Sequence, residues 1–207
     1  KAGVVAPGQS VRLGDVGGTV FAQPSASGAI LLGSDHELVV TSRTYNTAAT
    51  GTFGQYIEGY PTATAITTGE SVRLIGLTKN SLYRTNIGFA SAAATTTAIT
   101  TEVHRSDGSL LGSRTTTLQP FGWAAEGNLI DTFTKTDVND AFAIISSTSP
   151  NARFFTYASV IDNRTGDPIQ VVPVGRTGES ATLVAGAWME PGRAPADPRL
   201  DPGRREL

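Results

Sequence analysis

The chain has two histidines, His36 and His104, and no cysteine. General-base catalysis of the usual kind would therefore depend on one of these histidines. Hydrolysis by a serine requires a base beside the nucleophile. The segment Gly69-Glu70-Ser71 lacks the second glycine of a nucleophile elbow. His104 falls on the polar side of an expected strand, where we expect it to be solvated. The sequence therefore predicts that the chain is not an enzyme, and a hydrolase with an unrecognised site remains an alternative.

Two groups of polar residues have the side-chain types that bind metals. Asp35-His36-Glu37 is a run of three adjacent residues, which point to opposite faces of an extended chain and predict a surface loop. Asp137, Asn139 and Asp140 have the alternating oxygens of a calcium loop, but lack the glycine and the distant glutamate of the helix-loop-helix type. They stay the calcium candidate beside our prediction of no metal and no cofactor.

Aromatic residues are the feature that could form a binding surface. Tyr45, Phe53, Tyr56 and Tyr60 lie within a short stretch rich in Gly and Thr, and Trp123 follows a Pro-Phe-Gly turn. Tyrosine and tryptophan on a rigid β scaffold stack on sugar rings and anchor protein partners. The alternative is that Phe53 and Tyr56 point inward from a strand and that Trp123 fills the core. The candidate ligand-binding residues are Tyr45, Tyr56, Tyr60 and Trp123.

Composition limits the classes of partner. Charged residues make up 16% of the chain, below the usual share of about a quarter, and the net charge is −2. Nucleic-acid binding needs a concentrated basic face, and a membrane helix needs about 18 consecutive apolar residues. The sequence has neither, so we predict no nucleic-acid partner and no membrane insertion. A surface of Thr, Ser and Gly with only three lysines is common in secreted β proteins, and predicts an extracellular or cell-surface location.

Self-similarity gives the clearest architectural signal. Residues 8–13 read GQSVRL and residues 69–74 read GESVRL, and looser versions begin at Gly122 and Gly178. The spacings are 61, 53 and 56 residues. About 30 residues after each of the first three glycines comes a β-like run closed by a turn signal. Repetition at a fixed spacing indicates repeated structural units, so the sequence predicts imperfect repeats of about 55 residues.

Short apolar or alternating runs, broken by Gly, Pro and Ser, predict strands along the whole chain. The runs include 11–13, 19–23 and 29–32 near the start and 97–105, 109–117 and 154–161 later, about twelve in all. Asp107-Gly108 predicts a type I′ hairpin turn, and residues 136–142 predict one helical turn. We expect an all-β fold, an antiparallel β-sandwich of jelly-roll or Greek-key type, with a β-trefoil-like arrangement as the alternative.

The composition changes at residue 190. Four prolines lie among charges with almost no apolar residue in 190–207, and such a segment cannot bury enough surface to order itself. We therefore divide the chain into a β-sandwich domain, 1–189, and a Pro-rich linker or disordered tail, 190–207.

Several segments resemble a known class of module. These are 41–46 (TSRTYN), 51–57 (GTFGQYI), 83–89 (YRTNIGF) and 157–163 (YASVIDN), the last with Gly166-Asp167-Pro168. The chain resembles uncharacterised all-β sandwich modules of large secreted or surface bacterial proteins over about residues 30–174. The resemblance implies location and class and carries over no functional residue.

The expected function is that of a non-catalytic structural or adhesive module in a bacterial surface or self-assembling structure. Its expected partners are further copies of itself or neighbouring domains of the same parent. An uncharged edge with few lysines does little to prevent pairing with another chain, and a terminal strand such as 4–13 could complete a neighbour's sheet. The alternative is a carbohydrate-binding accessory domain with a glycan partner.

Overall fold

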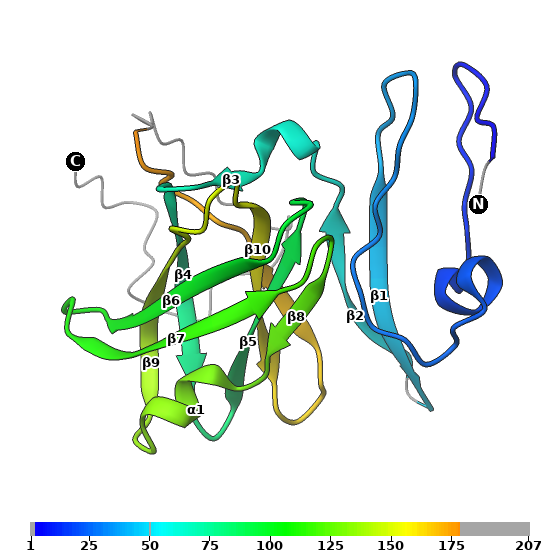
Figure 1. The fold of residues 1–207 in the computed structure, drawn as a ribbon. Coiled ribbons are helices and arrows are strands. Elements are labelled where there is room, and N and C mark those ends of the chain that lie inside the picture. The colour runs from blue at the N-terminus through cyan, green and yellow to red at the C-terminus, as the bar shows by residue number, and fades with distance from the viewer. Residues whose placement is uncertain (1–2, 50, 179–207) are drawn as a thin grey trace, which may run out of the picture.

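Nine strands between Ile66 and Val171 form two antiparallel sheets that pack against each other (Figure 1). The computed structural model describes residues 3–49 and 51–178. A two-stranded hairpin, formed earlier in the chain, lies beside the two sheets. The arrangement is consistent with a β-sandwich. The described strands close no barrel, so the β-trefoil alternative, which requires one, does not fit.

The first sheet has five strands in the order β11-β10-β5-β8, and β3 also pairs with β10. Its strands are β3 (Ile66–Thr67), β5 (Tyr83–Ser91), β8 (Trp123–Glu126), β10 (Arg153–Asp162) and β11 (Pro168–Val171). The central position of β10 agrees with its sequence, in which both faces are at least half apolar. The second sheet has the order β4-β9-β6-β7. Its strands are β4 (Ser71–Lys79), β6 (Thr97–Arg105), β7 (Leu110–Leu118) and β9 (Val138–Ser146).

The core lies between the two sheets and is built from alternate residues of their strands. In β6, Ile99, Thr101 and Val103 are buried while the residues between them are not, as expected where apolar and polar residues alternate along 97–105 and one face is covered. The other fully buried large side chains come from both sheets and from the short helix α1 (Leu129–Phe133): Leu74, Leu77, Ile87, Phe89, Leu118, Leu129, Ile130, Ile145 and Phe154.

Residues 3–60 lie outside the two sheets. They contain a π-helical turn, η1 (Val16–Val20), and the hairpin of β1 (Thr41–Ala48) and β2 (Gly51–Glu58). A 3₁₀ turn, η2 (Thr62–Thr64), leads into β3. β2 lies between β1 and the sheets (Figure 1) and contacts β11. None of residues 3–48 that the structure describes is buried.

The strands predicted at 11–13, 19–23 and 29–32 are wrong. Asp15 accepts a hydrogen bond from the Gly18 N–H and closes the turn η1, which takes up part of the second run. The other two runs form no strand and have no pairing partner among the described residues. Alternation of apolar residues predicts a strand only where a second strand completes its hydrogen bonds.

Residues 8–13 and 69–74 begin with the same turn. Gly8 and Gly69 have φ of +74° and +83°, and the next N–H donates to the carbonyl three residues back, Gln9 to Ala6 and Glu70 to Thr67. The two segments then differ. Val72 and Leu74 enter the core in β4, whereas Val11 and Leu13 are 58% and 59% exposed. The repeated sequence therefore specifies the turn, and only its second copy forms a core strand.

Two further predictions are wrong in detail. The hairpin at Asp107-Gly108 exists, but only Gly108 has positive φ, and a type I′ turn needs positive φ at both positions. The segment predicted as a helical turn, 136–142, belongs to β9 from Val138 onward, while α1 comes earlier, at Leu129–Phe133. Val138, Ala141, Ala143 and Ile145 are buried in β9, so contact with the core decides the conformation of this segment. The predicted domain boundary at residue 189 and the tail 190–207 lie outside the described residues.

Candidate functional site

An exposed face of the β1–β2 hairpin brings together two of the four predicted aromatic residues. Directly opposite residues share a face of an antiparallel pair. The register places Arg43 opposite Tyr56 and Tyr45 opposite Gly54, so all four lie on one face. Tyr45 and Tyr56 are 52% and 55% exposed, and the Arg43 guanidinium lies 5.2 Å from the centre of the Tyr45 ring. The same guanidinium donates a hydrogen bond of 3.0 Å to the Thr52 hydroxyl. The face therefore presents two exposed tyrosines and an arginine whose guanidinium is held by Tyr45 and Thr52.

The opposite face of the hairpin attaches it to the sandwich. Gln55 is buried, and its side-chain oxygen accepts a hydrogen bond of 2.9 Å from the Ser159 hydroxyl on β10. Gln170 lies opposite Ser159 in the neighbouring strand β11, and its side-chain nitrogen is buried without a hydrogen-bond partner. The hydrogen bond between Gln55 and Ser159 is therefore a polar contact that attaches the hairpin to the first sheet.

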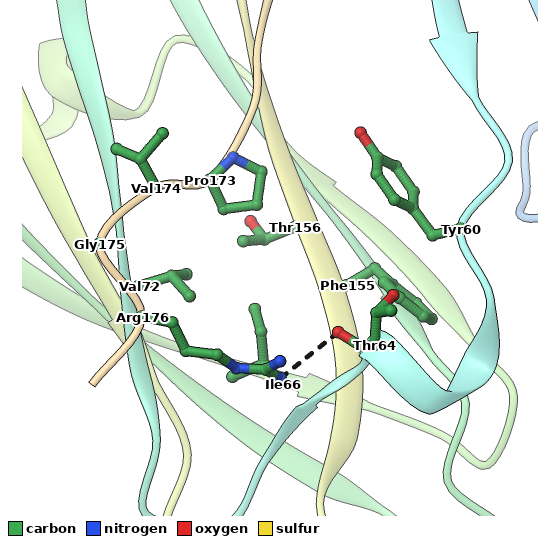
Figure 2. Close-up of a pocket in the computed structure, with 10 residues that line it drawn as sticks. All are labelled: Tyr60, Thr64, Ile66, Val72, Phe155, Thr156, Pro173, Val174, Gly175 and Arg176. Carbon is green, nitrogen blue, oxygen red and sulfur yellow. Dashed lines mark hydrogen bonds between the residues drawn. The ribbon is translucent and has the colours of Figure 1, made fainter. Parts of the chain in front are cut away.

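Tyr60 takes part in a cavity rather than in the exposed face. Its ring stacks on Phe155 with a centroid distance of 5.8 Å. β11 pairs with residues 158–161 of β10 and β3 pairs with residues 153 and 154, so a gap remains beside Phe155 and Thr156. Figure 2 shows the cavity at this gap. It is lined by Tyr60, Thr64, Ile66, Val72, Phe155, Thr156, Pro173, Val174, Gly175 and Arg176.

Arg176 connects the segments that line this cavity. Its guanidinium donates to the carbonyls of Thr64 and Ala65 and pairs with Glu70 at 3.0 Å. A hydrogen bond from the Thr67 N–H is the main cause that lowers the pKa of Glu70, and Arg176 lowers it further. One guanidinium nitrogen thus makes all of these contacts, whereas the Nε atom is buried without a hydrogen-bond partner among the described residues. Figure 2 shows the hydrogen bond from Arg176 to Thr64 beside the cavity.

The cavity is small. Its volume is about 210 Å³, whereas sites for drug-sized ligands run to about 300–1,000 Å³. Its lining is apolar apart from two threonines, the tyrosine and the occupied arginine. Such a space can take one apolar side chain or one small ring, and it offers no pair of groups for acid–base chemistry.

Trp123 lies away from Tyr45 and Tyr56, on β8 at the far edge of the first sheet. It is half-buried and forms a side-chain hydrogen bond with Tyr157, whose pKa is raised by burial. The Tyr157 ring in turn covers Gly88 in β5, because a Cβ added to Gly88 would overlap it. Trp123 therefore belongs to a packed layer on the outer side of this sheet.

The calcium candidate residues lie at the start of β9. Asp137 precedes the strand, and Asn139 and Asp140 are exposed neighbours within it. The Asn139 side-chain oxygen accepts a hydrogen bond of 2.8 Å from Asn80, so it is already partnered. Among the described residues, no three His, Asp or Glu side chains gather in a way that could hold a metal ion.

The histidines lie in different surroundings. His36 is exposed and lies 3.1 Å from the neighbouring Asp35 carboxylate. His104 is not solvated as expected, because its ring stacks on Phe142 at 5.1 Å and its Nδ1 lies 3.1 Å from the Gly108 carbonyl. The Ser71 hydroxyl lies 2.7 Å from the Thr177 hydroxyl. Within residues 3–49 and 51–178, no contact of Ser71 or of either histidine pairs a hydroxyl with an imidazole.

Sequence reasoning missed Arg43, Gln55 and Arg176. Arg43 could have been found, since it lies two residues before Tyr45 in an extended run and so shares its face. Gln55 and Arg176 gave no local signal, because their partners Ser159 and Thr64 lie 104 and 112 residues away.

No helix among residues 3–49 and 51–178 combines the length and the apolar character needed to cross a membrane. Searches against protein-family models, curated proteins and solved structures find no match to this chain.

Proposed function

We propose that this chain is a non-catalytic structural or adhesive module that works by association with further copies of itself. The observation that carries the proposal is the exposure of the N-terminal region. Between residues 4 and 39, ten large hydrophobic side chains are exposed: Val4, Val5, Val11, Leu13, Phe21, Ile30, Leu31, Leu32, Leu38 and Val39. Single exposed hydrophobic residues are ordinary, but gathered ones mark surfaces that bind other proteins.

The proposal includes a finer description of the fold. We take the sandwich to be of jelly-roll or Greek-key type and to derive from imperfect repeats of about 55 residues. The identical turns at Gly8 and Gly69 support the repeat. Residues 8–13 repeat the sequence that enters the core at 69–74, but they are exposed. They therefore provide apolar side chains that no core covers.

We further propose an extracellular or cell-surface location in a bacterium. The composition, poor in lysine and rich in Thr, Ser and Gly, supports this location, as does the resemblance to modules of secreted proteins. Neighbouring domains of a longer parent would be partners of the same kind as further copies. Nucleic acid and membrane insertion are left out of the proposal on grounds of charge and hydropathy.

Sedimentation velocity of the full-length chain at rising concentration tests the proposal. We expect concentration-dependent association, and we expect the double variant Ile30→Asp with Leu32→Asp to weaken it. The matched control is Ile75→Asp, which changes a side chain of similar exposure on β4. A monomer at every concentration would contradict the proposal.

Glycan binding is the second candidate function, favoured by the shared exposed face of Tyr45 and Tyr56. Aromatic rings on a rigid strand pair can stack on sugar rings, and Arg43 between them can donate hydrogen bonds to hydroxyls. Tyr56→Ala should then abolish binding to immobilised glycans, while Tyr83→Ala, an exposed tyrosine on β5, should not. Equal binding by both variants would remove this candidate.

A further inference from the structure

We propose that the free edge of β1 pairs antiparallel with β1 of a second copy of this chain, with Thr44 on the two-fold axis. The inference rests on the proposed self-association and adds a second surface to the exposed residues 4–39, the edge of the strand that follows them. An edge strand presents unpaired N–H and C=O groups, and proteins block such edges with short strands, prolines, bulges, charges or a covering segment. The edges of the two sheets are blocked in these ways, and β1 is not.

The edges of the second sheet are blocked by bulges, by ion pairs and by a covering segment. β4 has register shifts around Leu77 and a positive φ at Gly76. Residues 174–177 cover part of it, because the backbones of Arg73 and Val174 exchange hydrogen bonds of 2.8 and 2.9 Å. At the other edge, β7 has a register shift against β6 between Val103 and His104, and its Arg114 pairs at 2.7 Å with Glu126 of the first sheet.

The edge strands of the first sheet are short. β8 and β11 have four residues each, and β11 begins with a proline. β1 differs from all of these edges. It has eight residues, all exposed, and its register with β2 runs without a shift from Thr41 to Ala48. It contains no proline, glycine or lysine and has a single charge, on Arg43. In the described part of the chain β1 pairs with β2 alone.

The hydrogen-bond pattern shows which groups are offered at this edge. The Val40 carbonyl accepts a hydrogen bond of 2.9 Å from the Gly59 N–H, so residue 40 directs its polar groups toward the β2 side. Backbone groups alternate in direction along a strand. The N–H and C=O groups of Thr41, Arg43, Tyr45 and Thr47 therefore point away from β2, toward the free edge.

A second copy fits this edge because two identical strands related by a two-fold axis are self-complementary. With Thr44 opposite Thr44 of the second copy, Arg43 lies opposite Tyr45 and Thr41 opposite Thr47, each twice. The residues that point outward then form the hydrogen-bonded pairs. A register shifted so that Arg43 faces itself would place like charges opposite each other, which destabilises a strand pair.

The exposed face of the hairpin supports the same register. Arg43 already lies between Tyr56 on β2 and the open edge. In the proposed pairing the next side chain across the edge is Tyr45 of the second copy, so each Arg43 has a tyrosine opposite it on both neighbouring strands. Cation–π contacts of this kind favour arginine next to tyrosine. The two tyrosines and the arginine would thus become one row across a four-stranded sheet.

Cysteine cross-linking of the full-length chain tests the register directly, because the chain has no native cysteine. Thr44→Cys places two thiols opposite each other at a non-hydrogen-bonded pair, where Cα atoms lie about 4.5 Å apart. A disulfide forms within that distance. Ser42→Cys is the matched control on the same strand and face. Its two copies would lie four residues apart, about 13 Å, so it should not link.

A charge exchange tests the same pairing without cysteines. Tyr45→Arg puts an arginine opposite Arg43 of the other copy at each of the two symmetry-related pairs. It should weaken association about tenfold. Adding Arg43→Glu restores opposite charges and should recover the association constant of the unmodified chain. Circular dichroism of each variant checks that the sandwich remains folded.

The outcomes separate this inference from the proposed function. If Thr44→Cys links no faster than Ser42→Cys, or the double variant fails to recover, the β1 pairing is wrong. Association that persists in these variants would leave the proposed function standing with a different surface. A chain that stays monomeric without any substitution would overturn both.

Discussion

Glu70 is the carboxylate on which the corner between β3 and β4 depends. It accepts hydrogen bonds from the Thr67 N–H at 2.7 Å and from the Thr67 hydroxyl at 2.9 Å, and it pairs with Arg176. These contacts lower its pKa, so the stabilisation is present above the pKa of the unfolded chain and is lost as pH falls through the lowered one. The acid is partly exposed, which limits its contribution to about 1 kcal/mol or less.

We therefore expect Glu70→Gln to lower the free energy of unfolding at neutral pH by an amount that shrinks on acidification. Urea denaturation of both proteins, repeated from neutral pH downward, measures the difference. A difference that stays constant across the lowered pKa would show that the charge of Glu70 is not the cause.

Gly88 is required by the Tyr157 ring that covers it. A Cβ at Gly88 would overlap that ring, and forcing extra atoms into a packed site costs about 1–3 kcal/mol. We expect Gly88→Ala to destabilise the chain by that amount, and Tyr157→Ala in the same chain to remove the added penalty. Gly127→Ala is the control, since its Cβ would make only an ordinary contact with Asn86. Equal effects of the two alanines, measured by urea denaturation, would contradict this assignment.

At the scale of the element, the β1–β2 hairpin is a unit that can open separately from the sandwich. Its main polar contact with the sheets is the Gln55–Ser159 hydrogen bond. Gln55→Ala leaves the Ser159 hydroxyl buried and unpaired, which costs about 1–3 kcal/mol, whereas removing both polar groups is closer to neutral. Amide hydrogen exchange should therefore rise in β1 and β2 for Gln55→Ala, while β5 and β9 keep their protection. The exchange rates of β1 and β2 should return toward those of the unmodified chain when Gln55→Leu is combined with Ser159→Ala. Faster exchange throughout the sheets would mean that hairpin and sandwich unfold together.

The elements also show how far the sequence could predict this structure. The strand 97–105, which has a buried alternating face, was predicted with its correct bounds, because burial on one face fixes both period and register. The runs at 11–13 and 29–32 have similar apolar residues but no partner strand, and pairing over long distances leaves no local mark. Most of the segment 136–142 forms part of β9, and it was predicted wrongly because its partner strands β4 and β6 are distant in the sequence and leave no local signal. For the candidate site, Tyr45 and Tyr56 were found from their type, while Gln55 depended on a contact 104 residues away.

At the scale of the whole molecule, stability and association are carried by different parts of the chain. The hydrophobic core lies in the two sheets and the segments that join them, whereas β1 has no buried residue. A core substitution should therefore change unfolding without changing the surface that pairs, and a β1 substitution should do the reverse. Ile145 is fully buried in β9, and its replacement by alanine should cost about 2–5 kcal/mol.

We thus expect Ile145→Ala to lower the urea midpoint while Thr44→Cys in the same chain still cross-links under conditions where the protein remains folded. The pair Arg43→Glu and Tyr45→Arg should leave the midpoint unchanged, measured at a concentration low enough to keep the protein monomeric, because association otherwise adds to apparent stability. If Ile145→Ala abolished cross-linking while the circular dichroism stayed native, the edge of β1 would depend on the core. Hairpin and sandwich would then have to be treated as one cooperative unit.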